Sequence, residues 1–356
     1  MSRVLAILTL LFAFAPVVRA DKLVLVAGGT KDENGVAAVD GKLNGPFAID
    51  FDRVGNAYIA EMIGLRIRKI DGQGKLTTIA GTGEKGKGPD EGPALKAQFD
   101  GPHHLAVSFN GDLYVADTWN NRVRKIDAKT GMITTIAGTG EKGFSGDGGP
   151  AVKAKMGGVY CLAFDAEYTK LFVADLDNRR IRAIDLTTGN ITTIAGNGEK
   201  GVPKDGQPAT AEPLVDPRAV AVDHRGNVYI LERSGNALRV VDVDGKIRTV
   251  AGTGKTGATG DGGPAKEATF NGPKHLCVDR DNNVLIADTE NHLIRKYLPK
   301  EGKIVRVAGN GKKGTGGLDG PPEEAELCQP HGVLVDVTGT IFISDSGNNR
   351  VLKIKK

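Results

Sequence analysis

Apolar and polar residues alternate in short runs along the chain, and turn residues separate these runs. In residues 101–140 the runs are His104–Ser108, Asp112–Asp117, Arg122–Ile126 and Met132–Ala137. They are rich in β-branched and aromatic side chains, and Asn-Gly and Thr-Gly dipeptides lie between them. Runs of this length with such turns are typical of neighbouring antiparallel strands. The pattern therefore predicts a four-stranded meander.

The same pattern occurs six times at an almost fixed interval. Each copy has a phrase like VADTWNNRVRKID (residues 115–127), and the acid in this phrase recurs every 56 to 58 residues. The six acids are Glu61, Asp117, Asp175, Glu232, Asp288 and Asp345. A small sheet with apolar residues on both faces needs neighbouring sheets to cover it. Six copies therefore predict an all-β fold, a six-bladed β-propeller of four-stranded antiparallel blades.

The two ends of the chain are predicted to meet in one blade. The last repeat contains three strand-like runs, Gly332–Val337, Thr340–Asp345 and Arg350–Lys355. Leu23–Gly28, near the other end, matches the fourth run of earlier repeats. We therefore expect the first strand of the mature chain to complete the sixth blade, which closes the ring and hides two sheet edges.

Residues 1–20 have the pattern of an export signal. Arg3 precedes an apolar run, Val4–Ala15, that is too short to span a bilayer, and residues 18–20 resemble a cleavage site. We expect residues 21–356 to form a single propeller domain in the periplasm or outside the cell, with no membrane span. The 47 basic and 43 acidic residues are interspersed, which argues against a nucleic-acid partner.

The repeated acid is expected to be structural, capping turn amides and holding an arginine. A catalytic or metal role is the alternative. Three positions after the acid stands Gly or Asn, which we expect to adopt positive φ in the turn between the second and third strands. Four repeats carry an arginine five positions after the acid, and we expect it to pair with the acid. These arginines are Arg66, Arg122, Arg180 and Arg350.

The phrase resembles the NHL repeat, whose pattern Ala-Asp-Thr-x-Asn-x-Arg-Ile-Arg-Lys recurs here over residues 22–356. Loops such as Gly-Asp-Gly-Gly-Pro-Ala (146–151) also resemble those of exported bacterial NHL propellers and of the teneurin NHL domain. The resemblance implies a scaffold for binding or protein interaction, which does not by itself fix an activity.

A ligand site is expected where the first strands of the six repeats begin, at the mouth of the central channel. Aligning these starts after the recurrent Gly-Pro places six residues at equivalent positions: Phe47, His103, Tyr160, Arg218, Lys274 and His331. One position further in stand Ala48, His104, Cys161, Ala219, His275 and Gly332. The turns after the second strands bring Trp119 and Arg233 to the same mouth.

These candidate ligand-binding residues form a cationic and aromatic rim. Such a rim suits an anionic or carbohydrate-like ligand, or a peptide or protein carboxylate. No nucleophile and base occur in a recognisable arrangement, so no catalytic residue is assigned and a non-enzymatic binding module is favoured. Polar plugging of a wet channel mouth is the structural alternative for His103 and His331.

A metal-dependent hydrolase or lyase is the competing hypothesis. Six-bladed propellers similar to this one include lactonases and the peptidyl-amidoglycolate lyase, in which Pro-His at the first strand of three alternate blades binds zinc. Pro102-His103 and Pro330-His331 match that pattern, which implies His103 and His331 as metal ligands. The third corner holds Arg218, whose permanent charge repels a cation.

The sequence requires no cofactor, although zinc or calcium is conceivable. Aspartates in the long loops, as at Asp147, could contribute to calcium sites, but each loop offers few of the 6–8 oxygen ligands that calcium needs. They equally suit the start of a short helical turn. The three cysteines, Cys161, Cys277 and Cys328, permit one disulfide, and buried free thiols are the favoured alternative.

Overall fold

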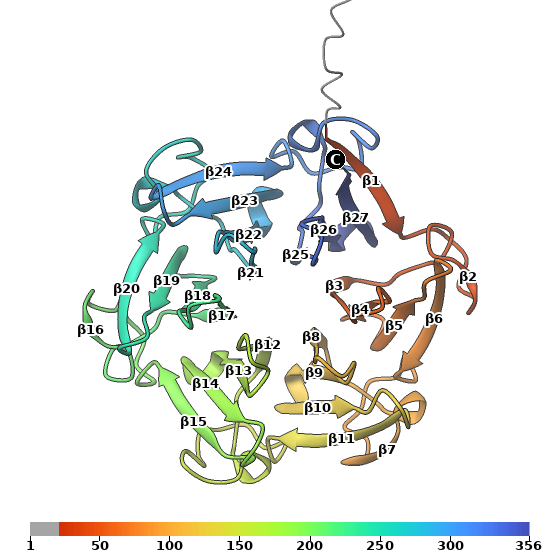
Figure 1. Cartoon of the computed structure of the whole chain (residues 1–356), viewed down its shortest axis with the longest axis horizontal. Helices are drawn as coiled ribbons and strands as arrows, with labels where there is room; N and C mark the ends of the chain where they lie inside the picture. The colour runs from red at the N-terminus through yellow and green to blue at the C-terminus, as the bar shows by residue number, and fades with distance from the viewer. Residues whose placement is uncertain (1–20, 356) are drawn as a thin grey trace, which may run out of the picture.

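Six small antiparallel sheets surround a common axis (Figure 1). The computed structural model describes residues 21–355, and the predicted signal peptide, residues 1–20, lies outside them. The predicted six-bladed β-propeller is confirmed. In every blade the first strand lies nearest the axis and the fourth lies at the outside (Figure 1).

Blades 1 to 5 are consecutive four-stranded meanders, as the alternation of apolar runs and turns predicted. Blade 1 contains β3 (Pro46–Phe51), β4 (Ala57–Glu61), β5 (Arg66–Ile70) and β6 (Lys75–Ala80). Blade 2 contains β8 (Pro102–Val107), β9 (Leu113–Asp117), β10 (Arg122–Ile126) and β11 (Met132–Ala137). Blade 3 contains β12 (Val159–Phe164), β13 (Lys170–Asp175), β14 (Arg180–Asp185) and β15 (Ile191–Ala195). Blade 4 contains β17 (Pro217–Val222), β18 (Val228–Glu232), β19 (Ala237–Val241) and β20 (Lys246–Ala251). Blade 5 contains β21 (His275–Val278), β22 (Val284–Asp288), β23 (Leu293–Leu298) and β24 (Lys303–Ala308).

Three blades carry a short fifth strand at the outer edge, which the sequence did not predict. These strands come from the long loops and pair with the fourth strand of their blade, where they shorten the free edge. They are β2 (Val36–Ala37), β7 (Glu91–Pro93) and β16 (Gln207–Pro208).

Blade 6 closes the ring. It contains β25 (Gly332–Val335), β26 (Ile341–Asp345) and β27 (Arg350–Lys355). The N-terminal strand β1 (Lys22–Ala27) pairs antiparallel with β27, with Leu23 opposite Ile354, and supplies the outer strand (Figure 1). Leu23 is fully buried, so both hydrogen bonds and apolar packing hold the two ends together. The predicted closure is confirmed.

Short 3₁₀ turns occupy two places in the repeat. One set follows the prolines of the long loops, as predicted: η1 (Ala94–Lys96), η3 (Ala151–Lys153), η5 (Ala265–Glu267) and η7 (Pro322–Glu324). The other set joins the second and third strands: η2 (Thr118–Asn120), η4 (Leu176–Asn178), η6 (Thr289–Asn291) and η8 (Ser346–Asn348).

The loop aspartates do not cap the first set of turns. Three of them instead form ion pairs with arginines of the third strands, at 2.7 to 2.8 Å. The pairs are Asp90–Arg122, Asp147–Arg182 and Asp261–Arg295. Carboxylates engaged in this way are poor candidates for the calcium sites considered above, because an adjacent guanidinium repels a second cation.

The repeated acid is a buried structural anchor, as predicted. In all six blades one of its oxygens accepts a backbone N–H from the segment before the first strand, for example from Asp100 to Asp117 at 2.9 Å. In four blades the Asn three positions on also donates to it, for example Asn120.

The predicted arginine partner was wrong in two blades. The acid pairs with the arginine five positions on only at Asp117 and Asp345, whereas five blades use the arginine seven positions on. These five are Arg68, Arg124, Arg182, Arg239 and Arg295. Residues two apart on a strand share a face, so the longer diagonal reach brings the second arginine over the acid.

Positive φ occurs one position later than predicted. The residue four positions after the acid has φ between 44° and 58° in all six blades. These residues are Leu65, Asn121, Arg179, Asn236, His292 and Asn349. The 3₁₀ turn needs a left-handed residue at its C-terminal end, which leaves the preceding Asn free to hold the acid.

Apolar side chains fill the spaces between neighbouring blades, and most residues of the three inner strands of each blade are buried. Cys161, Cys277 and Cys328 belong to this interior and are free thiols, as favoured. No helix in residues 21–355 is long and apolar enough to cross a membrane.

Candidate functional site

Six side chains meet where the first strands begin. We call Phe47, His103, Tyr160, Arg218, Lys274 and His331 the mouth ring. In blades 1 to 4 the start of the first strand contains a β-bulge, for example between Pro102 and His104. A bulge inserts one extra residue and breaks the alternation of faces. This is how the consecutive His103 and His104 can both line the axis.

Aromatic contacts form one side of the mouth ring. Phe47 stacks on His331, with ring centroids 3.8 Å apart, and meets His103 edge-on at 5.2 Å. His103 lies edge-on to Tyr160 at 4.7 Å and to Trp119 at 5.1 Å. Three predicted site residues, Phe47, Tyr160 and Trp119, thus surround His103, and His331 stacks on Phe47. Trp119 is 48% exposed and offers its ring to solvent.

Arg218 is the least compensated charge in the mouth ring. Its guanidinium lies 4.2 Å from the centre of the Tyr160 ring, and only 5% of the residue is exposed. Within residues 21–355 no carboxylate lies within 4.0 Å of it, and its Nε has no hydrogen-bond partner. Burial lowers the pKa of Arg218 to about 10, so the side chain remains charged at neutral pH. A buried cation without a partner is energetically costly, which marks this position as a place for an anion.

Lys274 and Arg233 are held in place by acids. Lys274 Nζ donates to Glu290 at 2.7 Å and lies 3.3 Å from Nε2 of His331. Arg233 Nε donates to Asp216 at 2.9 Å, and this turn residue lies at the rim, as predicted. These two cations are oriented by their partners and keep further donor atoms available.

The two mouth histidines are neutral hydrogen-bond acceptors. Nδ1 of His103 lies 2.7 Å from the carbonyl oxygen of Gly101, and Nδ1 of His331 lies 2.8 Å from that of Gln329. Both Nδ1 atoms must therefore carry the proton, which leaves a lone pair on each Nε2. Burial, together with Arg218 near His103 and Lys274 near His331, holds both pKa values well below the usual range.

This tautomer is the one that a metal-bound histidine uses. The surroundings are nevertheless unfavourable for an ion bridging His103 and His331, because the Phe47 ring contacts both of them and Lys274 lies beside one. Arg218 supplies a second positive charge in the same ring. The pair is better suited to accept hydrogen bonds from a bound molecule.

A second set of possible metal ligands lies one layer deeper. The donor atoms of His104, Cys161 and His275 all lie within 4.8 Å of one another, and all three residues are buried. Each histidine, however, has a backbone N–H and not an acceptor near its Nδ1, that of Leu162 for His104 and that of Val333 for His275, both at 3.3 Å. A histidine that binds metal through Nε2 has its proton on Nδ1 and needs an acceptor there. The backbone therefore presents the wrong group for a metal at this layer.

The two deeper histidines bond to each other instead. Their Nε2 atoms are 2.7 Å apart, so one ring must donate and the other accept. Burial lowers the pKa of both His104 and His275, the latter to about 4, and both are neutral at physiological pH.

A shallow hollow of about 360 Å³ adjoins the rim between blades 3 and 4. Its lining includes Lys142, Arg179, Lys200 and Arg233, against two carboxylates. The carboxylates, Asp177 and Asp216, are paired with Lys142 and Arg233. The hollow therefore has an excess of positive charge next to the mouth.

The alignment of strand starts missed a cavity at the opposite end of the channel. It has a volume of about 570 Å³ and is lined by the first strands of all six blades. Its wall includes Asp50, whose equivalents in the other blades are Ala106, Ala163, Ala221, Cys277 and Leu334. Aligning the residue three positions after each mouth-ring residue would have singled out this carboxylate.

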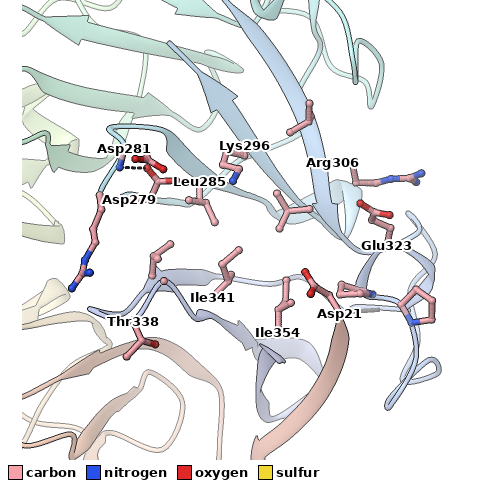
Figure 2. A pocket seen from close by; sticks show the side chains of 17 residues that line it. Asp21, Asp279, Asp281, Leu285, Lys296, Arg306, Glu323, Thr338, Ile341 and Ile354 are labelled. Atoms are coloured by element: carbon pink, nitrogen blue, oxygen red, sulfur yellow. Dashed lines mark hydrogen bonds between the residues drawn. The ribbon is translucent and has the colours of Figure 1, made fainter. Parts of the chain in front are cut away.

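Figure 2 shows a further hollow, of about 800 Å³, between blades 5 and 6 on the outside of the ring. Leu285, Ile341 and Ile354 form an apolar floor, and charged groups such as Asp21 and Lys296 stand at its edges. It contains none of the predicted site residues. Its polar groups do not converge on one point (Figure 2), so it carries no site chemistry comparable to that of the channel.

Family models match separate parts of the chain. The NHL repeat model matches residues 99–126, 270–297 and 327–354, and the teneurin NHL domain model matches residues 184–259. Each NHL match begins before a first strand and ends in a third strand, so it covers the buried acid and its arginines.

Two larger proteins are similar to this chain in sequence. Protein SUPPRESSOR OF QUENCHING 1, chloroplastic, from Arabidopsis thaliana is 27% identical over 78% of this chain and 27% of its own length. Teneurin-3 from Mus musculus is 31% identical over 57% of this chain and 8% of its own length. The chain thus spans about a quarter or less of these larger proteins.

Among solved structures, an auxiliary nutrient binding protein from Bacteroides thetaiotaomicron aligns with a TM-score of 0.69 at 16% identity. The alignment covers 94% of this chain and 76% of that one. At this identity the likeness concerns the fold alone. The repeat matches and the six blades lead to one conclusion: the chain is a six-bladed β-propeller that contains NHL repeats and is similar in part to the NHL domain of teneurins.

Proposed function

We propose that this chain is an exported binding module, whose residues 21–356 form one propeller domain with a ligand site at the channel mouth. The site consists of the mouth ring together with Trp119 and Arg233. It receives an anionic group of a carbohydrate-like or peptide ligand, or of a protein partner.

One observation carries this proposal: Arg218 is buried and charged but lacks a partner among the described residues. An arginine that served only to pack would be replaced at little cost by an apolar residue, because a buried unpaired charge is destabilising. A carboxylate, sulfate or phosphate of a ligand would accept the two-pronged hydrogen bonds that guanidinium groups prefer.

The neighbours of Arg218 extend the recognition. Lys274 and Arg233 add charge without moving, because Glu290 and Asp216 already hold them. The free Nε2 of His103 is suited to accept a hydroxyl or amide N–H next to the anionic group. The exposed Trp119 ring provides a flat surface for stacking against a sugar or a peptide side chain.

The Bacteroides protein that shares this fold is called an auxiliary nutrient binding protein, which is consistent with a binding role for this chain. A hydrolase or lyase that uses His103 and His331 with a metal is the competing function. It has less support, because Arg218 and Lys274 place positive charge beside both histidines. Zinc found in stoichiometric amount, and lost in the His103→Ala/His331→Ala double variant, would favour the enzyme.

Binding to arrays of acidic and neutral glycans, and of peptides with free or amidated C-termini, tests the proposal. The wild-type protein should bind anionic glycans or peptides. The Arg218→Met variant should no longer bind these ligands, and the Trp119→Ala variant should bind them more weakly. Arg248→Ala is the matched control, because Arg248 is exposed on β20 of the same blade. If the Arg218→Met and Trp119→Ala variants bind every array ligand as the wild type does, the proposed site is wrong.

A further inference from the structure

The cavity at the end of the channel opposite the mouth is a second place where the six blades differ. We call it the lower cavity; it is lined by the first strands and by the turns that follow them. His104 and His275 form its floor toward the mouth ring. A volume of about 570 Å³ lies in the range of small-molecule sites.

Asp50 is the exceptional residue of the lower cavity. At the equivalent position the other five blades have Ala, Cys or Leu. The Asp50 carboxylate accepts backbone N–H groups from Phe51 at 2.8 Å and from Val107 at 2.7 Å. Within residues 21–355 no lysine, arginine or histidine forms an ion pair with it.

The two amide bonds explain why a polar residue is tolerated, but they do not compensate the charge. They reach different oxygens, Phe51 N–H at Oδ1 and Val107 N–H at Oδ2, so a neutral asparagine could accept only one of them. Burial outweighs them and raises the pKa of Asp50 to about 6, so the ionised form is incompletely stabilised by its surroundings. His104 and His275, which line the same cavity, add no positive charge, because burial keeps both of them neutral.

The charge of the whole cavity is negative. Four of its lining residues are aspartates, Asp50, Asp52, Asp165 and Asp336, and the last three accept amides of the turns after the first strands. Its one arginine, Arg53, lies over the ring of Phe109, at 3.9 Å from the centroid.

Aromatic rings form part of the wall. Phe109, Phe164 and Tyr168 are in mutual contact, with Tyr168 centred 6.1 Å from Phe109 and 5.1 Å from Phe164. Their π faces attract cations. The Asp50 charge contributes to a raised pKa of Tyr168, although burial is the larger cause, so the carboxylate acts on this part of the cavity electrostatically.

We propose that the lower cavity binds a small organic ammonium ion, with Asp50 as its counter-ion and the Phe109, Phe164 and Tyr168 rings around its alkyl groups. The apolar wall of Ala106, Ala163, Ala221 and Leu334 suits the carbon atoms of such a ligand. A bare metal ion would find one carboxylate and an apolar wall, which are too few ligands. The proposal does not depend on the function proposed for the mouth.

Isothermal titration with charged and neutral ligands of the same shape tests this site. The probes are choline, tetramethylammonium and n-butylammonium, and 3,3-dimethylbutan-1-ol serves as the uncharged counterpart of choline. The wild-type protein should bind at least one of the three cations, and choline at least about tenfold more tightly than its neutral counterpart, since one charged contact is worth about that factor.

Variants assign the binding to Asp50. Asp50→Asn removes the charge and keeps one of the two acceptors, and the folded variant should bind the cation about tenfold or more weakly. Tyr168→Gly removes a ring at a residue with φ of 57°, where glycine is favoured, and should weaken binding severalfold without unfolding the protein. Glu301→Gln, an exposed change of the same charge on blade 5, should bind as the wild type does.

Three results would overturn the proposal. The first is that none of the three cations binds to the wild-type protein at millimolar concentration. The second is that 3,3-dimethylbutan-1-ol binds as tightly as choline. The third is that folded Asp50→Asn and Tyr168→Gly proteins both bind the cation as the wild type does.

Discussion

The guanidinium of Arg218 lies 4.2 Å from the centre of the Tyr160 ring and has no carboxylate within ion-pair distance in the described part of the chain. In blades 1 to 5, by contrast, the buried arginine seven positions after the repeated acid is paired with that acid. The charges of the repeated arginines are thus neutralised by carboxylates of the fold. The charge of Arg218 is not, and we propose that a bound anionic group neutralises it.

Replacement of Arg218 by methionine should leave stability unchanged or raise it by about 1 kcal/mol, because an unpaired buried charge is removed. Arg239→Met in the same blade should cost about 3 kcal/mol or more, because it leaves Glu232 buried without its cation. Urea unfolding of the two variants measures both effects. A loss of more than about 2 kcal/mol in Arg218→Met would show that the fold itself needs this arginine.

Loss of one repeated acid should be costly although five copies remain. Asp117→Ala removes an acceptor of the Asp100 amide and leaves Arg124 without its charge partner, so we expect a loss of about 3 kcal/mol. Asp127→Ala, in an exposed turn of the same blade, should cost about 1 kcal/mol or less. Comparable losses in the two variants on chemical denaturation would contradict the anchor role.

Ring closure by the N-terminal strand predicts a stability effect at Leu23. This side chain is fully buried between the ends of the chain, so Leu23→Ala should cost about 2 to 5 kcal/mol. Lys22→Ala, at the exposed start of the same strand, should have little effect. Equal midpoints of unfolding for Leu23→Ala and the wild type would mean that β1 contributes little to closure.

His275 should make the protein less stable as the pH falls. Its pKa is about 4 in the folded protein, because of burial and of the nearby Arg218, and about 6.5 when unfolded. Between these values the unfolded chain binds the proton and the folded protein does not, so the contribution of His275 is complete above pH 6.5 and is lost as the pH falls toward 4. His104, the partner ring, shifts in the same direction.

The measurement is the free energy of unfolding at several pH values between 7 and 4. His275→Asn should flatten the decline by about 1.4 kcal/mol per pH unit, which corresponds to one proton. The repeated acids act in the opposite sense, since burial raises the pKa of Asp117, Asp175 and Asp288 to about 6. They are present in both proteins, so their effect cancels in the comparison. An unchanged slope would place the His275 pKa near its ordinary value.

The repetition of strand and turn patterns was sufficient to predict the ring, its blade number and its closure. It failed where side-chain direction depends on local geometry. Glu61 was expected to pair with Arg66, but it pairs with Arg68. The reason is that Arg68, on the third strand, is the diagonal neighbour of Glu61 on the same face of the sheet. The positive φ at Leu65 lies in the turn between β4 and β5, one position after the Gly64 that the pattern indicated.

The mouth ring could be predicted because recurrent Gly-Pro pairs align the strand starts. Asp50 was missed for a physical reason. The β-bulge after Pro46 shifts the alternation of the strand by one residue, so alternation counted from Phe47 does not show which side chains face the channel beyond it. Comparison of the six blades at the position three residues on would have shown Asp50 as the one carboxylate. Neither the bulge nor the lower cavity has a signature in a single repeat.

Calorimetric titration in a double-mutant cycle tests the role of Arg218 most directly. An anionic hit from the arrays and its neutral amide or ester are each titrated into wild-type and Arg218→Met protein. If Arg218 receives the anionic group, the charge of the ligand and the arginine should be coupled by about 1.5 kcal/mol or more, and Arg248→Ala should show no coupling. Coupling near zero, with the anionic ligand bound equally by wild type and Arg218→Met, would contradict an anion site at the channel mouth.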